Sequence, residues 1–308
     1  MRRPIIATLA LITLLALAAG CGDTGATAEQ GSVTGRLPLV TTTTQLTDFA
    51  RIVGGNHVDV YGILKANVDP HDYEASPADV ARIASARVIV KNGVGLERWF
   101  DATIRSAEPK GAIVEAATGV ALRHGEGAEE ADGDPHVWHD PRNAKVMVHN
   151  IAVALEAADP THRGDYEANE AAYDKELDRL DNEIAAEIGG LANKKLVTNH
   201  DAFGYYVARY GLDFVGSIIP SFDTQAELSA QDLSDIVSRI RATGVKAVFS
   251  ESSVPAKTAE TIGRDAGVTV VAGDDALYGD SLGPIGSDGD TYLKMERHNT
   301  REIVDHLR

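Results

Sequence analysis

The sequence is poor in cysteine and in basic residues, and both shortages restrict what the protein can be. Cys21 is the only cysteine among 308 residues, so no disulfide can form within the chain. Lysine and arginine number 29 against 46 aspartates and glutamates, giving a formal net charge of −17 at pH 7. So acidic a chain argues against nucleic acid or an anionic membrane surface as its partner, and it weakly attracts cations. The HExxH pattern of zinc peptidases is also absent.

The N-terminal segment has the features of an export signal followed by a tether. Basic residues precede an almost unbroken apolar run of about fifteen residues, which is shorter than the ~20 that span a bilayer and typical of a signal peptide. The run leads into AAGC, which resembles a bacterial lipobox, although Ala18 stands where leucine is more common. We expect residues 1–20 to be a signal peptide and residues 21–36 to be a flexible tether, lipid-anchored through Cys21. The alternative is an ordinary secretory signal with an unmodified cysteine.

From residue 37 onward, short apolar runs alternate with segments of helical spacing. This alternation predicts an α/β fold with mostly parallel sheets. The strands are expected at 37–44, 57–64, 87–93, 111–117, 195–200, 213–219, 246–250 and 268–273. Between the two groups of strands the chain is rich in helix formers, and one stretch keeps helical spacing over ~23 residues, enough to span ~35 Å. We predict two βαβ-type lobes, residues 37–160 and 191–308, joined by one long rigid helix at 161–190.

Five residues that can bind a metal lie where the expected strands run out into loops. They are His71, His136, His139, His200 and Asp280. Ligands of open parallel sheets bind at the carboxyl ends of the strands, so groups from both lobes are expected to converge on the cleft between them. We expect the six remaining histidines to be structural or exposed.

The chemistry of this set favours capture of a metal over catalysis. Imidazole and carboxylate suit Zn²⁺ and similar first-row ions, whereas Ca²⁺ and Mg²⁺ prefer oxygen ligands. Three histidines and one aspartate would fill a tetrahedral zinc shell and leave no position for the water that a hydrolytic enzyme needs. Because an imidazole binds a metal only when unprotonated, affinity is expected to fall as the pH drops through about 6.5.

The stretch DPHVWHDP (134–141) contributes two of the histidines. Its prolines favour an extended backbone, in which residues three apart point to opposite faces. Only one of His136 and His139 should therefore reach a given ion, and the spacing does not say which.

Five ordered motifs resemble the cluster A-I solute-binding lipoproteins, the zinc and manganese receptors of bacterial ABC importers. They are VTTTTQLTDFARIVGG and the residues after it to Trp99, DPHVWHDPRNA, TNHDAFGYYVARYGL, VFSESSVP, and LYGDSLGPIGSDGDTYLKMERHNTREIV. The resemblance covers about residues 37–308 and implies two α/β lobes joined by a rigid helix, with the metal between them. It carries the ligands over onto His71, His136, His200 and Asp280, and it gives His139 no ligand role. It places Glu251 near the site, as a residue that supports a ligand without binding the metal.

The resemblance also bears on the metal and on the partners. His200 stands where members similar to manganese receptors tend to carry glutamate, and a third imidazole favours Zn²⁺ over Mn²⁺. Many zinc receptors carry a histidine-rich loop before the second DPH, whereas the loop at 124–135 is short and acidic here, so Mn²⁺ stays as the alternative. The expected function is capture of Zn²⁺ outside the cytoplasmic membrane by an anchored, monomeric receptor, which delivers it to an ABC permease and its ATPase. Local movement of the loops around Asp280 or His200 is expected to release the metal. The further alternatives are a zinc-dependent adhesin and an extracytoplasmic zinc hydrolase with Glu251 as its base.

Overall fold

The structure is a computed structural model that describes residues 35–125 and 132–308. The expected signal peptide, Cys21 and nearly all of the expected tether lie outside the described residues. Among the helices of the described part, none is both long enough and apolar enough to cross a membrane.

The first lobe is built on a parallel four-stranded sheet with strand order β2-β1-β3-β4. Its strands are β1 (Leu37–Thr41), β2 (Val58–Gly62), β3 (Val88–Lys91) and β4 (Ala112–Glu115). The helices between them are α1 (Thr44–Gly54), α2 (Pro77–Ser85) and α3 (Phe100–Ala107). The start of α2 is fixed by a capping box, because Ser76 and Asp79 each bind the other's backbone N–H and thereby satisfy two donors that the helix leaves free.

The second lobe repeats this plan with strand order β6-β5-β7-β8, again all parallel. Its strands are β5 (Lys195–His200), β6 (Asp213–Ile219), β7 (Ala247–Phe249) and β8 (Thr269–Val271). Its helices are α6 (Gly204–Tyr210), α7 (Ala230–Thr243), α8 (Lys257–Ala266) and the C-terminal α9 (Tyr292–Leu307).

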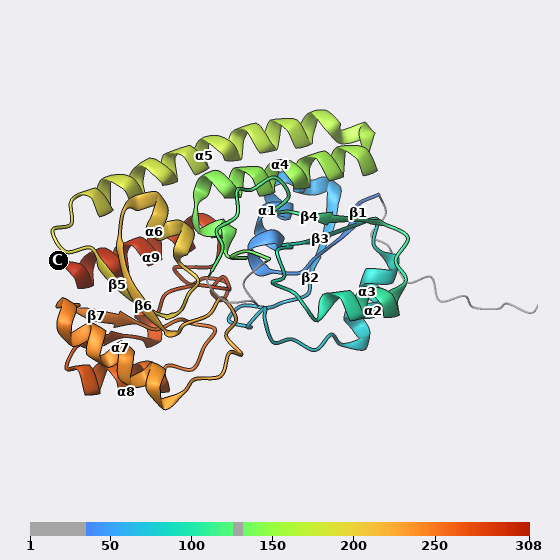
Figure 1. Cartoon of the computed structure of the whole chain (residues 1–308). Coiled ribbons are helices and arrows are strands. Elements are labelled where there is room, and N and C mark those ends of the chain that lie inside the picture. Colours follow the sequence, from blue (N-terminus) through green and yellow to red (C-terminus); the bar gives the residue numbers. More distant parts are fainter. Residues whose placement is uncertain (1–34, 126–131) are drawn as a thin grey trace, which may run out of the picture. The chain divides into compact units, whose positions relative to one another are not determined.

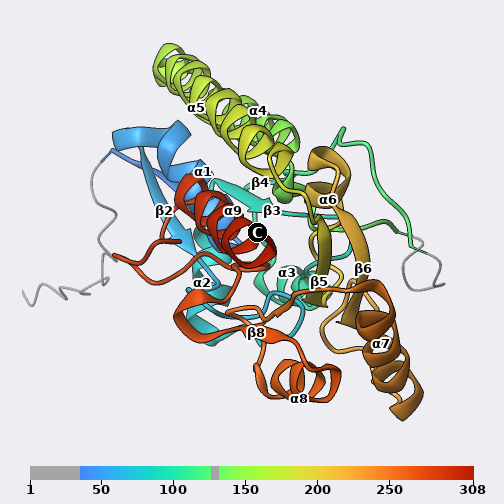
Figure 2. The same ribbon diagram turned by 90° about the vertical axis from the view of Figure 1, so that its left-hand side faces the viewer.

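Two helices join the lobes, α4 (Pro141–Ala158) and the 27-residue α5 (Arg163–Gly189). Figure 1 shows α5 running beside both lobes, with α4 alongside its first half. The buried residues of α5 are Tyr166 and then, at intervals of three or four, Tyr173, Leu177, Leu180, Ile184 and Ile188. These side chains share one apolar core with α1, α4 and α9. Figure 2 shows α9 lying close to α1 of the first lobe, which its contacts confirm.

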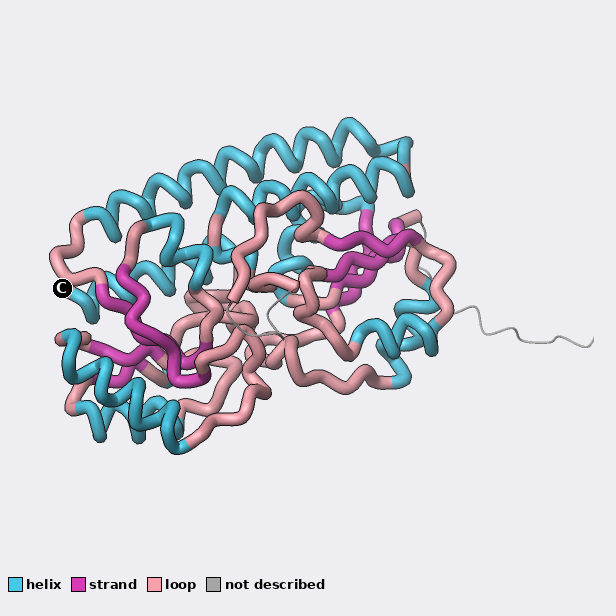
Figure 3. The backbone as a smooth tube through the Cα atoms, in the orientation of Figure 1, coloured by secondary structure: helices cyan, strands magenta, loops and turns pink. Residues whose placement is uncertain are grey.

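The predicted architecture is confirmed: two parallel α/β lobes joined by a long helix. Each strand lies within its expected range, and the ends are up to three residues shorter. The loops that follow the strands of both sheets meet between the lobes, where Figure 3 shows loop backbone gathered between the two sets of strands.

Candidate metal centre

Four of the five candidate residues come together between the lobes: His71, His136, His200 and Asp280. We call them the His₃Asp cluster. Each offers one nitrogen or oxygen, and these atoms all lie within 4.8 Å of one another. His71 lies in the loop after β2 and His136 lies just before α4, whereas His200 ends β5 and Asp280 lies in the loop after β8.

The spacing of the four groups fits a small tetrahedral ion. His136 Nε2 lies 3.3 Å from the Nε2 atoms of both His71 and His200, and 3.2 Å from Asp280 Oδ1. Two ligand atoms ~2.05 Å from a tetrahedral zinc ion would be ~3.3 Å apart. Asp280 is 1% exposed, and among the described residues its carboxylate oxygens face only the imidazole nitrogens of the cluster, with no hydrogen bond to any group outside it. The donor set and its buried carboxylate therefore suit a cation at the centre.

Two of the imidazoles are oriented by carboxylates behind them. His136 Nδ1 lies 2.8 Å from Asp134 Oδ1, and His200 Nδ1 lies 2.9 Å from Glu251 Oε1. In each case the Nδ1–H donates to the carboxylate, which leaves the lone pair of Nε2 directed into the cluster. Glu251 also accepts the backbone N–H of His200 at 3.1 Å. Glu251 therefore lies directly against a residue of the cluster.

The charges of the cluster shift its pKa values strongly. Burial lowers the pKa of His136, but its hydrogen bonds to Asp134 and Asp280 outweigh burial and raise it to about 9. The pKa of His200 is likewise raised despite burial, by the charges of Glu251 and Asp280. Burial would raise the pKa of Asp280, but His200 and His136 hold it well below its usual value. Burial lowers the pKa of His71 to about 4. Because a metal binds the unprotonated nitrogens, the raised pKa values of His136 and His200 mean that protons compete with a metal at these residues.

His139 lies outside the cluster, although it is completely buried. Its Nδ1 lies 2.9 Å from Glu296 Oε1 and its Nε2 lies 3.1 Å from the carbonyl oxygen of Gly279. The extended backbone that we predicted for this stretch is wrong, because residues 137–139 form a short 3-10 turn (η3). A proline restricts only the residue directly before it: Asp140, the N-cap residue of α4, is extended before Pro141, whereas residues 137–139 remain able to turn.

Several neighbours of the cluster were not predicted from the sequence. They are Arg123, which pairs with Asp134; Trp138, whose indole donates to Gly279; and Glu296. Each lies in an ordinary helix or loop pattern, and nothing in its own segment indicates its partner. Among the described residues, no other group of three candidate ligands converges as the His₃Asp cluster does.

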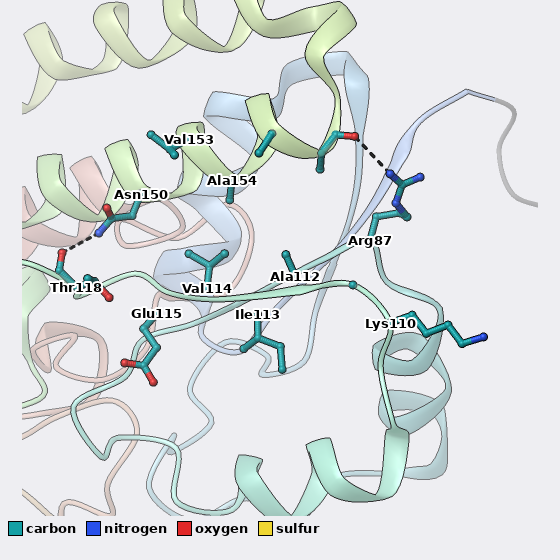
Figure 4. Close-up of a pocket in the computed structure, with 13 residues that line it drawn as sticks. Arg87, Lys110, Ala112, Ile113, Val114, Glu115, Thr118, Asn150, Val153 and Ala154 are labelled. Atoms are coloured by element: carbon teal, nitrogen blue, oxygen red, sulfur yellow. Dashed lines mark hydrogen bonds between the residues drawn. The ribbon is translucent and has the colours of Figure 1, made fainter.

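Two other features do not form a competing site. A groove of about 630 Å³ lies between β4 and α4, lined mainly by apolar side chains such as Ile113, Val114 and Val153 (Figure 4). No histidine lines this groove, and neither does Asp280, so the groove is separate from the metal centre.

The stretch GDSLG (279–283) matches the GxSxG pattern of serine hydrolases. However, Ser281 Oγ accepts the backbone N–H of Asn67, and no imidazole is paired with it in the described structure.

The chain is similar to known metal-binding receptors along nearly its whole length. The family model for ZnuA, the periplasmic component A of a zinc-uptake complex, matches residues 39–306. A manganese ABC transporter substrate-binding lipoprotein, PsaA of Streptococcus anginosus, is 30% identical over 98% of this chain and 97% of its own. An iron ABC transporter substrate-binding lipoprotein, MtsA of Streptococcus pyogenes serotype M1, is 30% identical over 94% of each chain. The solved periplasmic zinc-binding protein TroA of Treponema pallidum is 28% identical, with a TM-score of 0.81 over 89% of this chain and 99% of its own. The chain therefore belongs to the ZnuA family, a family of substrate-binding receptors of ABC transporters and not of enzymes.

Proposed function

We propose that this protein captures Zn²⁺ outside the cytoplasmic membrane and delivers it to the permease of an ABC importer. The coarser part of this function, an extracytoplasmic metal-binding receptor of an ABC importer, is supported by family membership. The observation that carries the choice of a metal and of the site is the convergence of three imidazoles and one carboxylate between the lobes.

The proposed ligands are His71, His136, His200 and Asp280. Three neutral imidazoles and one carboxylate around Zn²⁺ leave a charge near +1, which the buried carboxylate of Glu251 helps to neutralise through His200. Four protein ligands complete a tetrahedral shell, so the ion is held for transport with no open position for a reacting water. Imidazole nitrogen also suits Zn²⁺ better than it suits the harder Mn²⁺.

A manganese receptor of the same importer class is the second candidate. The observation in its favour is that PsaA, similar to this chain over nearly its whole length, is named for manganese. MtsA is named for iron, so the names of the relatives do not agree on one metal. The ligand chemistry of this chain favours zinc.

Purification without added metal, followed by identification of the bound ion, tests the proposal. The affinities for Zn²⁺ and Mn²⁺ are then compared by competition against a chelator of known affinity. We expect zinc to bind more tightly, and to bind with one ion per chain. Tighter binding of manganese would replace the zinc proposal by the second candidate, and failure to bind either ion would refute both.

The partners follow from the same proposal. We propose that Cys21 carries a lipid that anchors the monomeric receptor to the membrane, and that the importer consists of a permease and an ATPase. Labelling of the chain with a radioactive fatty acid, and loss of that label in Cys21→Ala, would test the anchor. A structural use of zinc, as in an adhesin, predicts instead that removing the metal unfolds the chain.

A further inference from the structure

His139 and Glu296 form a buried pair beside the metal centre. Both side chains are 0% exposed, and they come from segments 157 residues apart, just before α4 and within α9. Nδ1 of His139 faces the Glu296 carboxylate at 2.9 Å, and Nε2 faces the Gly279 carbonyl at 3.1 Å. A carbonyl only accepts hydrogen bonds, so Nε2 carries a hydrogen and donates it to Gly279, while the pair shares one further proton between Nδ1 and the carboxylate.

The carbonyl of Gly279 is held from two sides by one short segment. Besides His139, the indole Nε1–H of Trp138 donates to the same oxygen at 3.1 Å. Both donors lie in η3, within three residues of His136. The motif that supplies His136 to the cluster therefore also holds the peptide that precedes Asp280.

The opposite side of the same loop leaves no free space. A Cβ placed on Gly279 would lie 2.0 Å from Glu251 Oε2, so the loop packs directly against the carboxylate that orients His200. Residue 278 is fixed as well, because the Asn299 side chain of α9 accepts the N–H of Tyr278 at 2.8 Å and donates to its carbonyl at 2.9 Å. Gly279 thus lies between two fixed surfaces, one residue before Asp280.

We propose that His139 is a positioning residue for the metal site: through its hydrogen bond to Gly279 it holds the loop that carries Asp280, with Glu296 fixing the orientation of its ring. This inference rests on the proposed function and names one contact that slows loss of the metal, because it keeps the loop of Asp280 from moving away. Partners behind metal ligands commonly change metal affinity by about 10- to 100-fold when they are lost. The expected effect of losing the Gly279 contact is about a tenfold faster dissociation of the metal.

A matched pair of variants tests the contact to Gly279. Both variants are made in a Glu296→Gln protein, because replacing His139 alone would leave the Glu296 carboxylate charged and buried without a partner. In this Glu296→Gln background, the introduced amide can donate to Nδ1 of His139, and Nε2 of His139 keeps the hydrogen that it donates to Gly279. Into this background His139→Gln is introduced, whose amide can reach the position of Nε2, and separately His139→Asn, whose amide reaches only the position of Nδ1. Zn²⁺ dissociation is measured by rapid mixing of the loaded full-length protein with excess chelator, and the unfolding midpoint of each metal-free variant is measured in parallel.

We expect the His139→Asn variant to release zinc about tenfold faster than the His139→Gln variant, whatever the order of their unfolding midpoints. Equal rates, or rates that follow only the midpoints, would overturn the inference. If the His139→Asn variant does not fold, His139→Phe takes its place in the same background, because it removes the donor to Gly279 and keeps a ring that can stack on Phe203. A rate equal to that of His139→Gln would overturn the inference. Glu302→Gln, which alters another buried carboxylate of α9, should leave the rate unchanged. A wild-type protein that binds no metal would refute the proposed function instead, and the two failures are therefore distinguishable.

Discussion

The substitution Glu251→Gln tests whether the carboxylate behind His200 strengthens metal binding. Glutamine keeps the size of the side chain and an oxygen that can accept from the N–H and the Nδ1–H of His200, which now lie 3.1 and 2.9 Å from Glu251 Oε1. What disappears is the negative charge, which is buried with only 2% of the residue exposed. The substitution therefore isolates charge from geometry.

The magnitude follows from the strength of that hydrogen bond. A hydrogen bond to a charged acceptor contributes roughly 1.5–3 kcal/mol and one to a neutral acceptor roughly 0.5–1.5 kcal/mol. The difference, about 1–1.5 kcal/mol, corresponds to about tenfold weaker zinc binding. The loss should be larger at pH 8 than at pH 6. The Glu251 charge raises the pKa of His200, so at low pH the carboxylate also stabilises the proton that zinc must displace, and its removal relieves that competition.

The assay is chelator competition at pH 6 and pH 8, with Glu302→Gln as the matched buried control. The control should keep the wild-type affinity at both values. An affinity of Glu251→Gln within twofold of wild type at pH 8 would refute the reasoning, and so would a loss that is greater at pH 6 than at pH 8.

Three further results are expected. The carboxylate of Asp48 accepts the N–H of Tyr292, and burial raises its pKa from 3.8 to about 6. The protonated form therefore favours the folded state, and this contribution to stability is lost as the pH rises through 6. Asp48→Asn should therefore stabilise the protein by up to about 3 kcal/mol at pH 8 and hardly at all near pH 4, which denaturant titrations at both values would measure. Gly279→Ala would place a methyl group 2.0 Å from Glu251 Oε2 and should weaken zinc binding about tenfold or more, whereas Gly164→Ala, with no atom near the added Cβ, should not change it; calorimetric titration separates the two. Zinc at about 1,000 times its dissociation constant should raise the free energy of unfolding by about 4 kcal/mol, and an unchanged unfolding curve would show that the folded state does not bind it.

The fold could be predicted because its local signals agree with the final structure. The strands are short β-branched or apolar runs between helices, and the start of α2 is marked by Ser76, Pro77 and Asp79, which form the capping box that the structure shows. The segment that became α3 was not predicted. It follows Trp99, which lies at the N-cap position and makes no capping hydrogen bond with its side chain, so the sequence carries no start signal there.

The sequence predicted five candidate residues for the His₃Asp cluster, because parallel sheets bring the ends of their strands to one edge. The family resemblance then indicated which four of them are ligands. The surroundings of the cluster could not be predicted. His139 and Glu296 are each unremarkable in their own segments, and only the packing of α9 against the first lobe brings them together. The pKa values depend on the same convergence. The ordinary pKa near 6.5 for histidine gave the expected pH dependence, whereas Asp134 and Asp280 raise the pKa of His136 to about 9 despite its burial.

The supports behind the four cluster residues differ, and this difference predicts where the metal leaves. Asp134 accepts a hydrogen bond from His136, and Glu251 accepts one from His200. Asp280 is held through the preceding residue, because His139 donates to the carbonyl of Gly279. No carboxylate of the described residues is paired with Nδ1 of His71, whose side chain is also the most exposed of the four, at 5%, and lines a small pocket with Val94 and Phe222. Release through the loops of Asp280 or His200, as the sequence suggested, would have to break these supports, whereas His71 can withdraw without breaking them. We therefore expect His71→Ala to leave a three-residue site that still binds zinc but releases it faster, and His200→Ala to bind far more weakly. Equal affinities of the two variants in chelator competition would contradict this order.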